Sequence, residues 1–311
     1  MAGVTDNIFR KIVRKWAPDS LLFTEMINAS SLKQGFGKTK IKELEWDKGP
    51  VGVQIFDNRL FAVSEAAKEA EDYGAYLIDI NMGCPVKKIA KKGGGSALIK
   101  DRKLAVELVK RVVESVEIPV TVKTRLGWDN KEENIEDFLL RLQNAGASMI
   151  TLHGRTRKQG FSGKADWQMI GNLKDKLEIP LIANGDIKNP SDAINCLKQT
   201  NADGVMIGRA ILGSPWKLGE IDYAIKEIKG FKEPNIEEKL MLIIDHLEEL
   251  IKEKGDQGLL IARIHISWTC KDFKGASNLR NNLVRAVDKN EVRNLINKMI
   301  KTLNNEKNTL A

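Results

Sequence analysis

YLIDINMG, residues 76–83, is a short apolar segment in which isoleucines alternate with polar residues until a glycine ends it. Residues two apart along a strand share a face, so Ile78 and Ile80 lie on one side and Asp79 and Asn81 on the other. An apolar run of this length, closed by glycine, is typical of a buried strand. The segment predicts a strand with an apolar face against helices and an opposite polar face.

Segments of the same kind recur along the first two thirds of the chain. There are seven: SLLFTEM (20–26), VGVQIF (51–56), YLIDINMG (76–83), PVTVKTRLG (119–127), SMITLHGR (148–155), IPLIANGD (179–186) and DGVMIGR (203–209). Helix patterns such as 104–116 and 135–147 separate them, and the second ends at Gly146 as a helix C-terminus should. This alternation predicts a parallel α/β fold, a (β/α)8 TIM barrel whose first strand is missing.

The polar parity of these strands predicts a common pocket. In barrels the functional side chains stand at the carboxyl ends of the strands. Any single one of them could instead be a solvated strand-end residue, but six strands share the pattern. The residues expected to converge are Glu25, Gln54, Asn81, Lys123, His153 and Asn184.

The last two strands run into ANGDI and IGRAILG. Glycine there lets backbone N–H groups approach an anion, and a helix start beyond adds a favourable dipole. Arg209 can add a charged fork to the same phosphate. These segments predict a phosphate site of the kind that barrels place after strands seven and eight.

Beyond Gly230 the strand signal stops and amphipathic helix patterns replace it. We therefore expect a barrel domain at 1–230, a linker at 229–234 and a small helical domain at 231–311. A basic surface on that domain is a candidate RNA contact, and an ordinary solvated face is the equal alternative. Its residues are Arg263, His265, Lys271, Lys274, Arg280 and Arg285.

Composition narrows the class of protein. The 311 residues carry a formal net charge of +8, which favours an anionic partner such as nucleic acid, although a generally lysine-rich proteome explains the charge equally well. Three distant cysteines give neither a disulfide framework nor a metal pair, so no metal site is expected. No apolar run is long enough to span a membrane. We expect a cytoplasmic protein without an obligate protein partner.

The motifs MAGVTDNIFR, DINMGCPVKK, VTVKTRLGW, LHGRTRKQGFSGKADW, IPLIANGDI and GVMIGRAILGSPW, in this order and spacing, resemble the tRNA-dihydrouridine synthases, most closely the bacterial B-type subfamily. NMGCP together with HGRT and NGD makes the resemblance specific. It implies an FMN-bound TIM barrel followed by a helical tRNA-binding domain. It also implies an oxidoreductase that reduces the CH–CH bond of particular tRNA uridines, with NADPH (or NADH) as reductant.

The resemblance assigns roles to individual residues. Those matching the family's flavin site are Met1, Ala2, Gln54, Lys123, Asn184, Gly185, Asp186, Gly208 and Arg209, and those matching positions at the target base are Asn81, His153 and Arg155. Cys84 matches the proton donor. A thiol with a reference pKa of roughly 8.5 is mostly protonated at neutral pH, which suits an acid, whereas Cys196 and Cys270 have the setting of packing residues.

The substrate implied is a D-loop uridine that must be turned out of folded tRNA into the pocket. Basic residues in loops at the same mouth are expected to contact its phosphates: Lys87, Lys88, Lys91, Lys92, Arg155, Arg157 and Lys158. Two other classes remain open, a flavin barrel acting on a small molecule and an RNA-binding relative without activity. Lack of RNA binding would favour the first, and absence of flavin would favour the second.

The chain departs from the family pattern at two places. Relatives carry a strand before the Met-Ala-Gly motif, whereas here the motif methionine is Met1. We expect the codons upstream to encode the missing strand. The segment RIHISWT (263–269) has Ile264 and Thr269 where relatives carry lysine and tyrosine, which weakens the predicted RNA contacts of that segment.

Overall fold

The computed structural model describes residues 1–32, 34–129 and 134–310, the side chains of the last helix up to residue 305. It divides into two compact units, Met1–Arg14 with Pro18–Gly208, and Lys15–Ala17 with Arg209–Ala311. The predicted division at residue 230 into a catalytic and a tRNA-binding domain stays a prediction.

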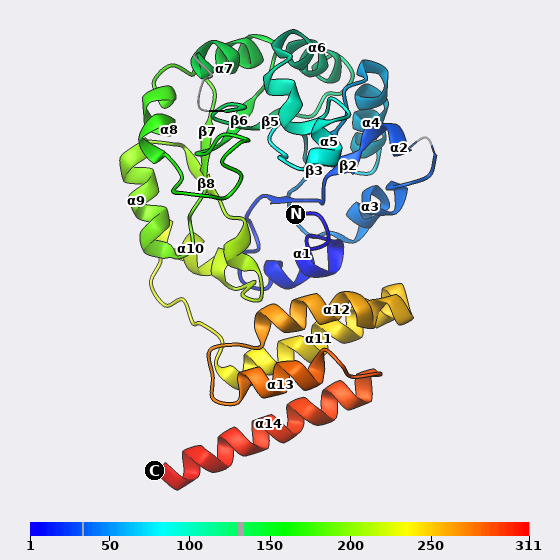
Figure 1. Cartoon of the computed structure of the whole chain (residues 1–311), viewed down its shortest axis with the longest axis vertical. Coiled ribbons are helices and arrows are strands. Elements are labelled where there is room, and N and C mark those ends of the chain that lie inside the picture. Colours follow the sequence, from blue (N-terminus) through cyan, green and yellow to red (C-terminus); the bar gives the residue numbers. More distant parts are fainter. Residues whose placement is uncertain (33, 130–133, 311) are drawn as a thin grey trace. The chain divides into compact units, whose positions relative to one another are not determined.

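The first unit is built on a sheet of parallel strands (Figure 1). They are β1 (Leu22–Phe23), β2 (Ile27–Asn28), β3 (Val51–Phe56), β4 (Leu77–Asn81), β5 (Val120–Arg125), β6 (Met149–His153), β7 (Leu181–Asn184) and β8 (Gly204–Met206). The order is β1-β3-β4-β5-β6-β7-β8, so each later strand pairs with its predecessor along the chain. Among the described residues no pairing joins β8 to β1. The predicted parallel α/β class is confirmed.

The first predicted strand is broken in two. β1 pairs with β3 at Val51 and Gly52, and β2 pairs with the same strand at Ile55 and Phe56. Between them Thr24 still donates its backbone N–H to the Gly52 carbonyl at 3.0 Å, and its hydroxyl accepts from the Gln54 N–H at 3.1 Å. The next residue, Glu25, therefore leaves the ladder and becomes available to a loop.

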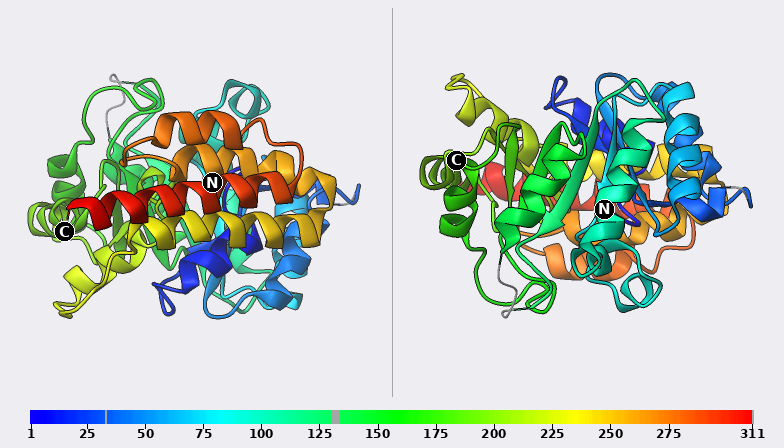
Figure 2. Two further views of the ribbon diagram at one scale, coloured as in Figure 1. Left: turned by 90° about the horizontal axis from the view of Figure 1, so that it is seen from below. Right: turned by 90° about the horizontal axis from the view of Figure 1, so that it is seen from above.

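Helices follow the strands as expected and form an arc around them (Figures 1 and 2). The longer ones are α1 (Asn7–Arg14), α4 (Leu60–Asp72), α6 (Arg102–Val113), α7 (Ile135–Asn144), α8 (Trp167–Lys174) and α9 (Pro190–Thr200). The shorter ones are α2 (Ala29–Leu32), α3 (Lys38–Lys42), η1 (Glu43–Trp46), α5 (Lys87–Ala90) and η2 (Gly95–Ile99). Side-chain caps begin several of them: Asp101 accepts from the Leu104 N–H and Asn189 from the Asp192 N–H. Gly146 (φ 99°) ends α7, as predicted.

The two faces of the sheet differ in chemistry. The residues alternating with the polar ones, such as Ile78, Ile80, Val122 and Ile150, are fully buried. The other parity carries Asp79, which is also fully buried. Burying a carboxylate is costly unless hydrogen bonds compensate it, so this face must hold an organised polar network.

The second unit is helical (Figure 2). It contains η3 (Arg209–Ile211), α10 (Lys217–Ile225), α11 (Ile236–Lys254), α12 (Asp256–Thr269), α13 (Ala276–Leu283) and α14 (Lys289–Leu310). Asn235 and Glu238 form a capping box at the start of α11. The break near KDFKG predicted between two helices separates α12 from α13. In the part of the chain that is described, no helix combines the length and apolar character needed to cross a bilayer.

Candidate active site

Strand register brings the inward polar residues together at the carboxyl end of the sheet. The pairs in register are Gln54 with Asp79, Asp79 with Thr121, Asn81 with Lys123, Arg125 with His153, and His153 with Asn184. Aligned residues of parallel strands point to the same face. The predicted convergence of Gln54, Asn81, Lys123, His153 and Asn184 is therefore what the structure shows.

Lys123 places an ammonium group among these residues. Its Nζ donates to Asn184 Oδ1 at 2.9 Å, and Asn184 Nδ2 in turn donates to the Met206 carbonyl at 2.8 Å. Burial lowers the pKa of Lys123 to about 8, against the opposing attraction of Asp79. A cation hydrogen-bonded to a neutral amide oxygen is well placed to meet an anionic group of a ligand.

Cys84 lies just beyond β4 and is half-buried. Asn81 Oδ1 accepts from the backbone N–H groups of Gly83 (3.2 Å) and Cys84 (2.9 Å), and the Ser96 N–H donates to the Cys84 carbonyl at 3.2 Å. Burial raises the pKa of the thiol, while the Val86 N–H, Arg125 and Lys123 act against that rise. The thiol is thus protonated at neutral pH, yet donors and cations are at hand to stabilise its thiolate.

Gly95 explains part of the glycine run in KKGGGS. It has φ +58°, and a Cβ there would stand 3.2 Å from Cys84 Cβ and from the Cys84 carbonyl oxygen. Gly94 and Gly95 are buried. Gly95 therefore packs against the cysteine, and a side chain at this position would press on it.

Arg125 connects the cysteine loop to the loop after β6. Its Nε donates to the Gly83 carbonyl at 2.7 Å, and its Nη1 donates to the carbonyls of Thr156 (3.2 Å) and Gly160 (2.9 Å). Arg125 is only 3% exposed, so these hydrogen bonds are shielded from solvent. Arg125 also lies 5.7 Å from the centre of the Phe161 ring.

His153 is a buried, neutral imidazole. Burial, reinforced by Lys123 and Arg125, lowers its pKa to about 2. Arg155 Nη1 stands 3.4 Å from Nε2, and because arginine can only donate, Nε2 is the acceptor. His153 therefore cannot supply a proton as an imidazolium at neutral pH.

Arg155 is placed differently from its predicted role at the substrate. It is 2% exposed, and its Nη2 donates to Asp186 Oδ2 and to the Gly163 carbonyl, both at 2.6 Å. Asp186 Oδ2 also accepts from the Ala165 N–H at 2.7 Å. This pair of a buried arginine and a half-buried carboxylate joins the loops after β6 and β7, so the geometry speaks against a direct phosphate contact by Arg155.

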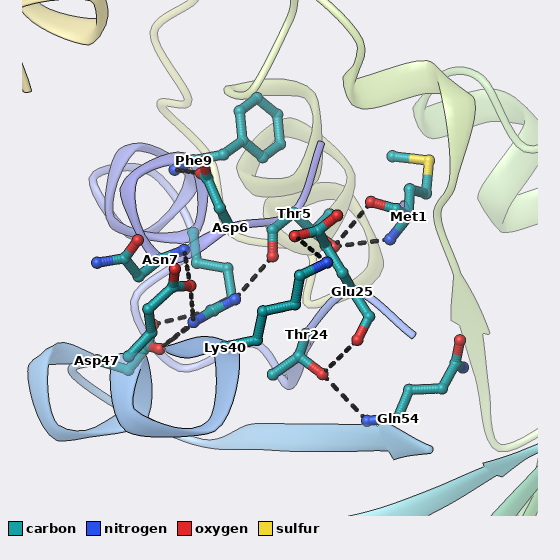
Figure 3. A network of polar contacts seen from close by, with 12 residues as sticks. Met1, Thr5, Asp6, Asn7, Phe9, Thr24, Glu25, Lys40, Asp47 and Gln54 are labelled. Carbon is teal, nitrogen blue, oxygen red and sulfur yellow. Dashed lines mark hydrogen bonds and ion pairs between the residues drawn. The ribbon is translucent and has the colours of Figure 1, made fainter. Parts of the chain in front are cut away.

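The first residues form a loop held from two sides (Figure 3). The Met1 carbonyl accepts from the N–H groups of Val4 and Thr5, and the Gly3 N–H donates to Glu25 Oε1 at 2.5 Å. Lys40 Nζ lies 2.9 Å from Glu25 Oε2. Glu25 thus supports the Met1–Ala2 loop and does not itself join the hydrogen bonds of the strand-end cluster.

The remaining predicted flavin residues flank the last strands. Gly185 (φ +122°) follows β7, and its carbonyl accepts from Trp167 Nε1 at 3.0 Å. A Cβ at Gly208 would meet no described atom within 4 Å, so that residue borders open space. Arg209 begins the second unit, and its place at the site stays a prediction.

Only some of the basic residues predicted to contact RNA are exposed to solvent. Lys87, Lys88, Lys91 and Lys92 are exposed on and beside α5. In the helical unit Lys271, Lys274 and Arg285 are exposed, whereas Arg263 and Arg280 donate to the carbonyls of Ala286 and Cys270. His265 is buried and its ring centre lies 4.4 Å from that of His246, so it was wrongly included in a solvent-facing surface.

Three contributors to this site were left out of the set of residues predicted to converge: Asp79, although its strand face was predicted, Gly95 and Arg125. Asp79 and Arg125 stand on the inward parity, so the alternation that selected Asn81 and Lys123 would also have selected them. Gly95 has no such signal, because its contact with Cys84 depends on how a loop folds back. Cys196 and Cys270 are buried, and burial raises the pKa of each thiol to about 11.

Comparison with known proteins gives the family. The sequence model described as "Dihydrouridine synthase (Dus)" matches residues 1–306. The chain is 47% identical over 302 residues to "Probable tRNA-dihydrouridine synthase 1" of Synechocystis sp., covering 97% of this chain and 85% of that protein. It is 37% identical over 282 residues to "tRNA-dihydrouridine synthase B" of Xanthomonas axonopodis pv. citri, covering 90% and 85%.

Solved structures resemble the fold at low identity. Morphinone reductase in complex with tetrahydroNAD aligns with a TM-score of 0.51 at 13% identity, covering 76% of this chain and 86% of that one. Histamine dehydrogenase from Rhizobium sp. 4-9 aligns with a TM-score of 0.55 at 15% identity, covering 78% and 46%. These likenesses confirm the predicted TIM-barrel class. With the family model and relatives matched over nearly its whole length, the chain belongs to the dihydrouridine synthase family.

Proposed function

We propose that this protein reduces uridines of tRNA to 5,6-dihydrouridine in the cytoplasm, with bound FMN and with NADPH or NADH as reductant. The observation that supports this most directly is the half-buried Cys84, whose backbone N–H is held by Asn81 Oδ1 at 2.9 Å just beyond the carboxyl end of β4. The similarity to tRNA-dihydrouridine synthases supports the substrate.

The residues fit a flavin. A flavin ring presents several acceptors along its polar edge, and its reduced form carries negative charge. Lys123 Nζ keeps donor capacity beyond Asn184, and Gln54 Nε2 uses one of its two N–H groups on Asp79. Lys123 would balance the charge, and Gln54 and Asn184 would orient the ring. Gly208 borders open space where a phosphate can approach the backbone, beside the predicted Arg209 contact.

Saturating the uracil C5–C6 bond needs a hydride at one carbon and a proton at the other. A flavin bound by these residues would supply the hydride for C6. Cys84 donates the proton to C5, because its raised pKa keeps it protonated and the neutral His153 cannot serve. The resulting thiolate is stabilised by the Val86 N–H and by Arg125 and Lys123. Asn81, which fixes the cysteine backbone, retains one amide N–H for the base.

The substrate base must leave a folded RNA to reach this thiol. Lys87, Lys88, Lys91 and Lys92 lie within eight residues of Cys84 in sequence and are exposed. Their contacts with phosphate would offset the roughly few kcal/mol needed to unstack a base. The exposed basic residues of the 231–311 region would add tRNA contacts.

The test compares Cys84→Ala with Cys196→Ala. Both proteins should retain flavin, measured by absorbance. The substrate is tRNA from a strain that lacks the gene, and dihydrouridine is measured by mass spectrometry. Cys84→Ala should form dihydrouridine at least roughly 100-fold more slowly, and Cys196→Ala should not. Full turnover in Cys84→Ala would refute the acid role, and reduction of free uridine or a small enoyl compound in preference to tRNA would refute the substrate.

A further inference from the structure

Asp79 is a buried carboxylate with no assigned part in the proposed chemistry. It is 0% exposed and stands in the middle of β4. Its Oδ1 accepts from the Thr121 hydroxyl at 2.7 Å, and its Oδ2 accepts from Gln54 Nε2 at 2.7 Å. Burying a carboxylate costs stability, so the position calls for an explanation in terms of what the group does there.

The contact with Gln54 starts a chain of hydrogen bonds that ends at the cysteine. Gln54 Oε1 accepts from Asn81 Nδ2 at 2.8 Å. Asn81 Oδ1 accepts from the backbone N–H groups of Gly83 at 3.2 Å and Cys84 at 2.9 Å. Three side chains thus connect the barrel interior to the loop that holds the thiol.

The hydrogen bonds that link Asp79 to the cysteine loop allow only one assignment of donors and acceptors. Burial raises the pKa of Asp79, against hydrogen bonds from Gln54 and Thr121, and both carboxyl oxygens face these donors. As an acceptor on both sides, Asp79 fixes the amino end of Gln54 toward itself. The Gln54 carbonyl then faces Asn81, which must present its amino group there and its carbonyl to the cysteine loop. Backbone N–H groups donate and cannot accept, so the far end also permits no reversal.

We infer that Asp79 is a positioning residue for Cys84, acting as the fixed hydrogen-bond acceptor that orients Gln54 and Asn81. Without that acceptor, the Gln54 amide loses its partner on the amino side and can rotate by half a turn, which sets its amino group against the Asn81 amino group and weakens the hold of Asn81 on Gly83 and Cys84. The inference rests on the proposed acid role of Cys84, because it explains how the thiol reaches its place above the strand ends.

The test measures the thiol directly. Purified flavin-loaded protein is treated with iodoacetamide between pH 6 and 10, and alkylation of each cysteine is followed by mass spectrometry. Burial is the main cause that raises the pKa of Cys84, so a loosened loop should lower that pKa. We expect Asp79→Ala to alkylate Cys84 about three- to tenfold faster at pH 8, since one pKa unit changes the thiolate fraction roughly tenfold. Turnover on tRNA should fall in kcat with little change in KM.

Matched controls separate positioning from general loosening. Thr121→Val removes the other hydrogen bond of the same carboxylate. The alkylation rate of Cys84 should then stay within about twofold of wild type, well below the roughly tenfold change that a shift of one pKa unit would cause. Asp79→Asn keeps an acceptor for Gln54, because the Thr121 hydroxyl can turn to accept from the new amide, and it should restore the wild-type rate. Cys196, buried in α9 of the same unit, should stay protected throughout.

Three results would overturn the inference: an unchanged Cys84 rate in Asp79→Ala, an equal rise in Thr121→Val or Asp79→Asn, or exposure of Cys196 in step with Cys84. If the alanine variant does not fold, Asp79→Leu fills the volume without an acceptor and carries the same expectation. A fully active Cys84→Ala would refute the acid role alone, since the alkylation profiles do not depend on turnover.

Discussion

Replacing Lys123 by methionine should change how the stability of the flavin-free protein depends on pH. Burial lowers the pKa of Lys123 from its ordinary 10.5 to about 8. Between these two values the unfolded chain binds the proton and the folded chain does not. The free energy of unfolding of the wild type therefore rises with pH across this window, relative to a variant that cannot titrate there.

The size of the effect follows from the two pKa values. Their difference, at roughly 1.4 kcal/mol per pKa unit, corresponds to about 3.5 kcal/mol. The side chain is half-buried and water reduces the penalty, so we expect ~2 kcal/mol. Lys123→Met should be the more stable protein at pH 7, and the gap should narrow as the pH rises from about 8 to 10 and close above 10.5.

The assay is urea unfolding of both proteins, stripped of flavin, at several pH values from 7 to 10. The difference between the two unfolding free energies cancels the titration of the other lysines. Lys123→Arg is the control that keeps the charge, and it should show no rise over this range because arginine does not titrate there. A gap between wild type and Lys123→Met that stays constant from pH 7 to 10 would refute the lowered pKa. The same experiment with flavin bound should show a smaller slope if the cofactor supplies the negative charge that Lys123 lacks.

Three further predictions concern the loops around Cys84. Gly95→Ala should change the alkylation rate of Cys84, because its Cβ would meet the cysteine at 3.2 Å. Gly255→Ala, with the same φ of +58° and no described neighbour within 4 Å, should leave that rate unchanged. Arg125→Met should lower the unfolding free energy by about 3 kcal/mol, since three carbonyls lose a charged donor, and a loss below about 1 kcal/mol would contradict the clamp. tRNA binding, measured by filter binding, should weaken when glutamine replaces Lys87, Lys88, Lys91 and Lys92, and the slope of log K against log salt concentration should flatten by up to about 0.7–0.9 per lost phosphate contact. The same change at Lys103 and Lys110 of α6 should alter neither.

The sequence allowed the strands and the inward parity to be predicted, because alternation in a parallel strand directly reports which side chains share a face. It also placed Cys84 directly after the predicted strand at 76–83, and in the structure Cys84 lies just beyond the end of β4. Alternation does not show which residues of other strands and loops a side chain will contact. Arg155 was expected at a phosphate because it is an arginine in a loop, yet its burial against Asp186 depends on two loops that are about thirty residues apart. His265 was misplaced for the same reason, since a helical pattern does not show which histidine faces another helix.

The assignment of the acid depends on which nearby groups can hold a proton at neutral pH. His153 is neutral because three cations, Lys123, Arg125 and Arg155, add to the effect of burial. Two of these cations, Lys123 and Arg125, also favour the thiolate form of Cys84. A single cluster of positive charge therefore has opposite consequences for the two groups: it removes the imidazole as a proton source and eases release of the thiol proton. An acid at the position of Cys84 is accordingly a property of the whole charged cluster, and removing one cation while the thiol stays buried, as in Arg125→Met, should raise the thiol's pKa.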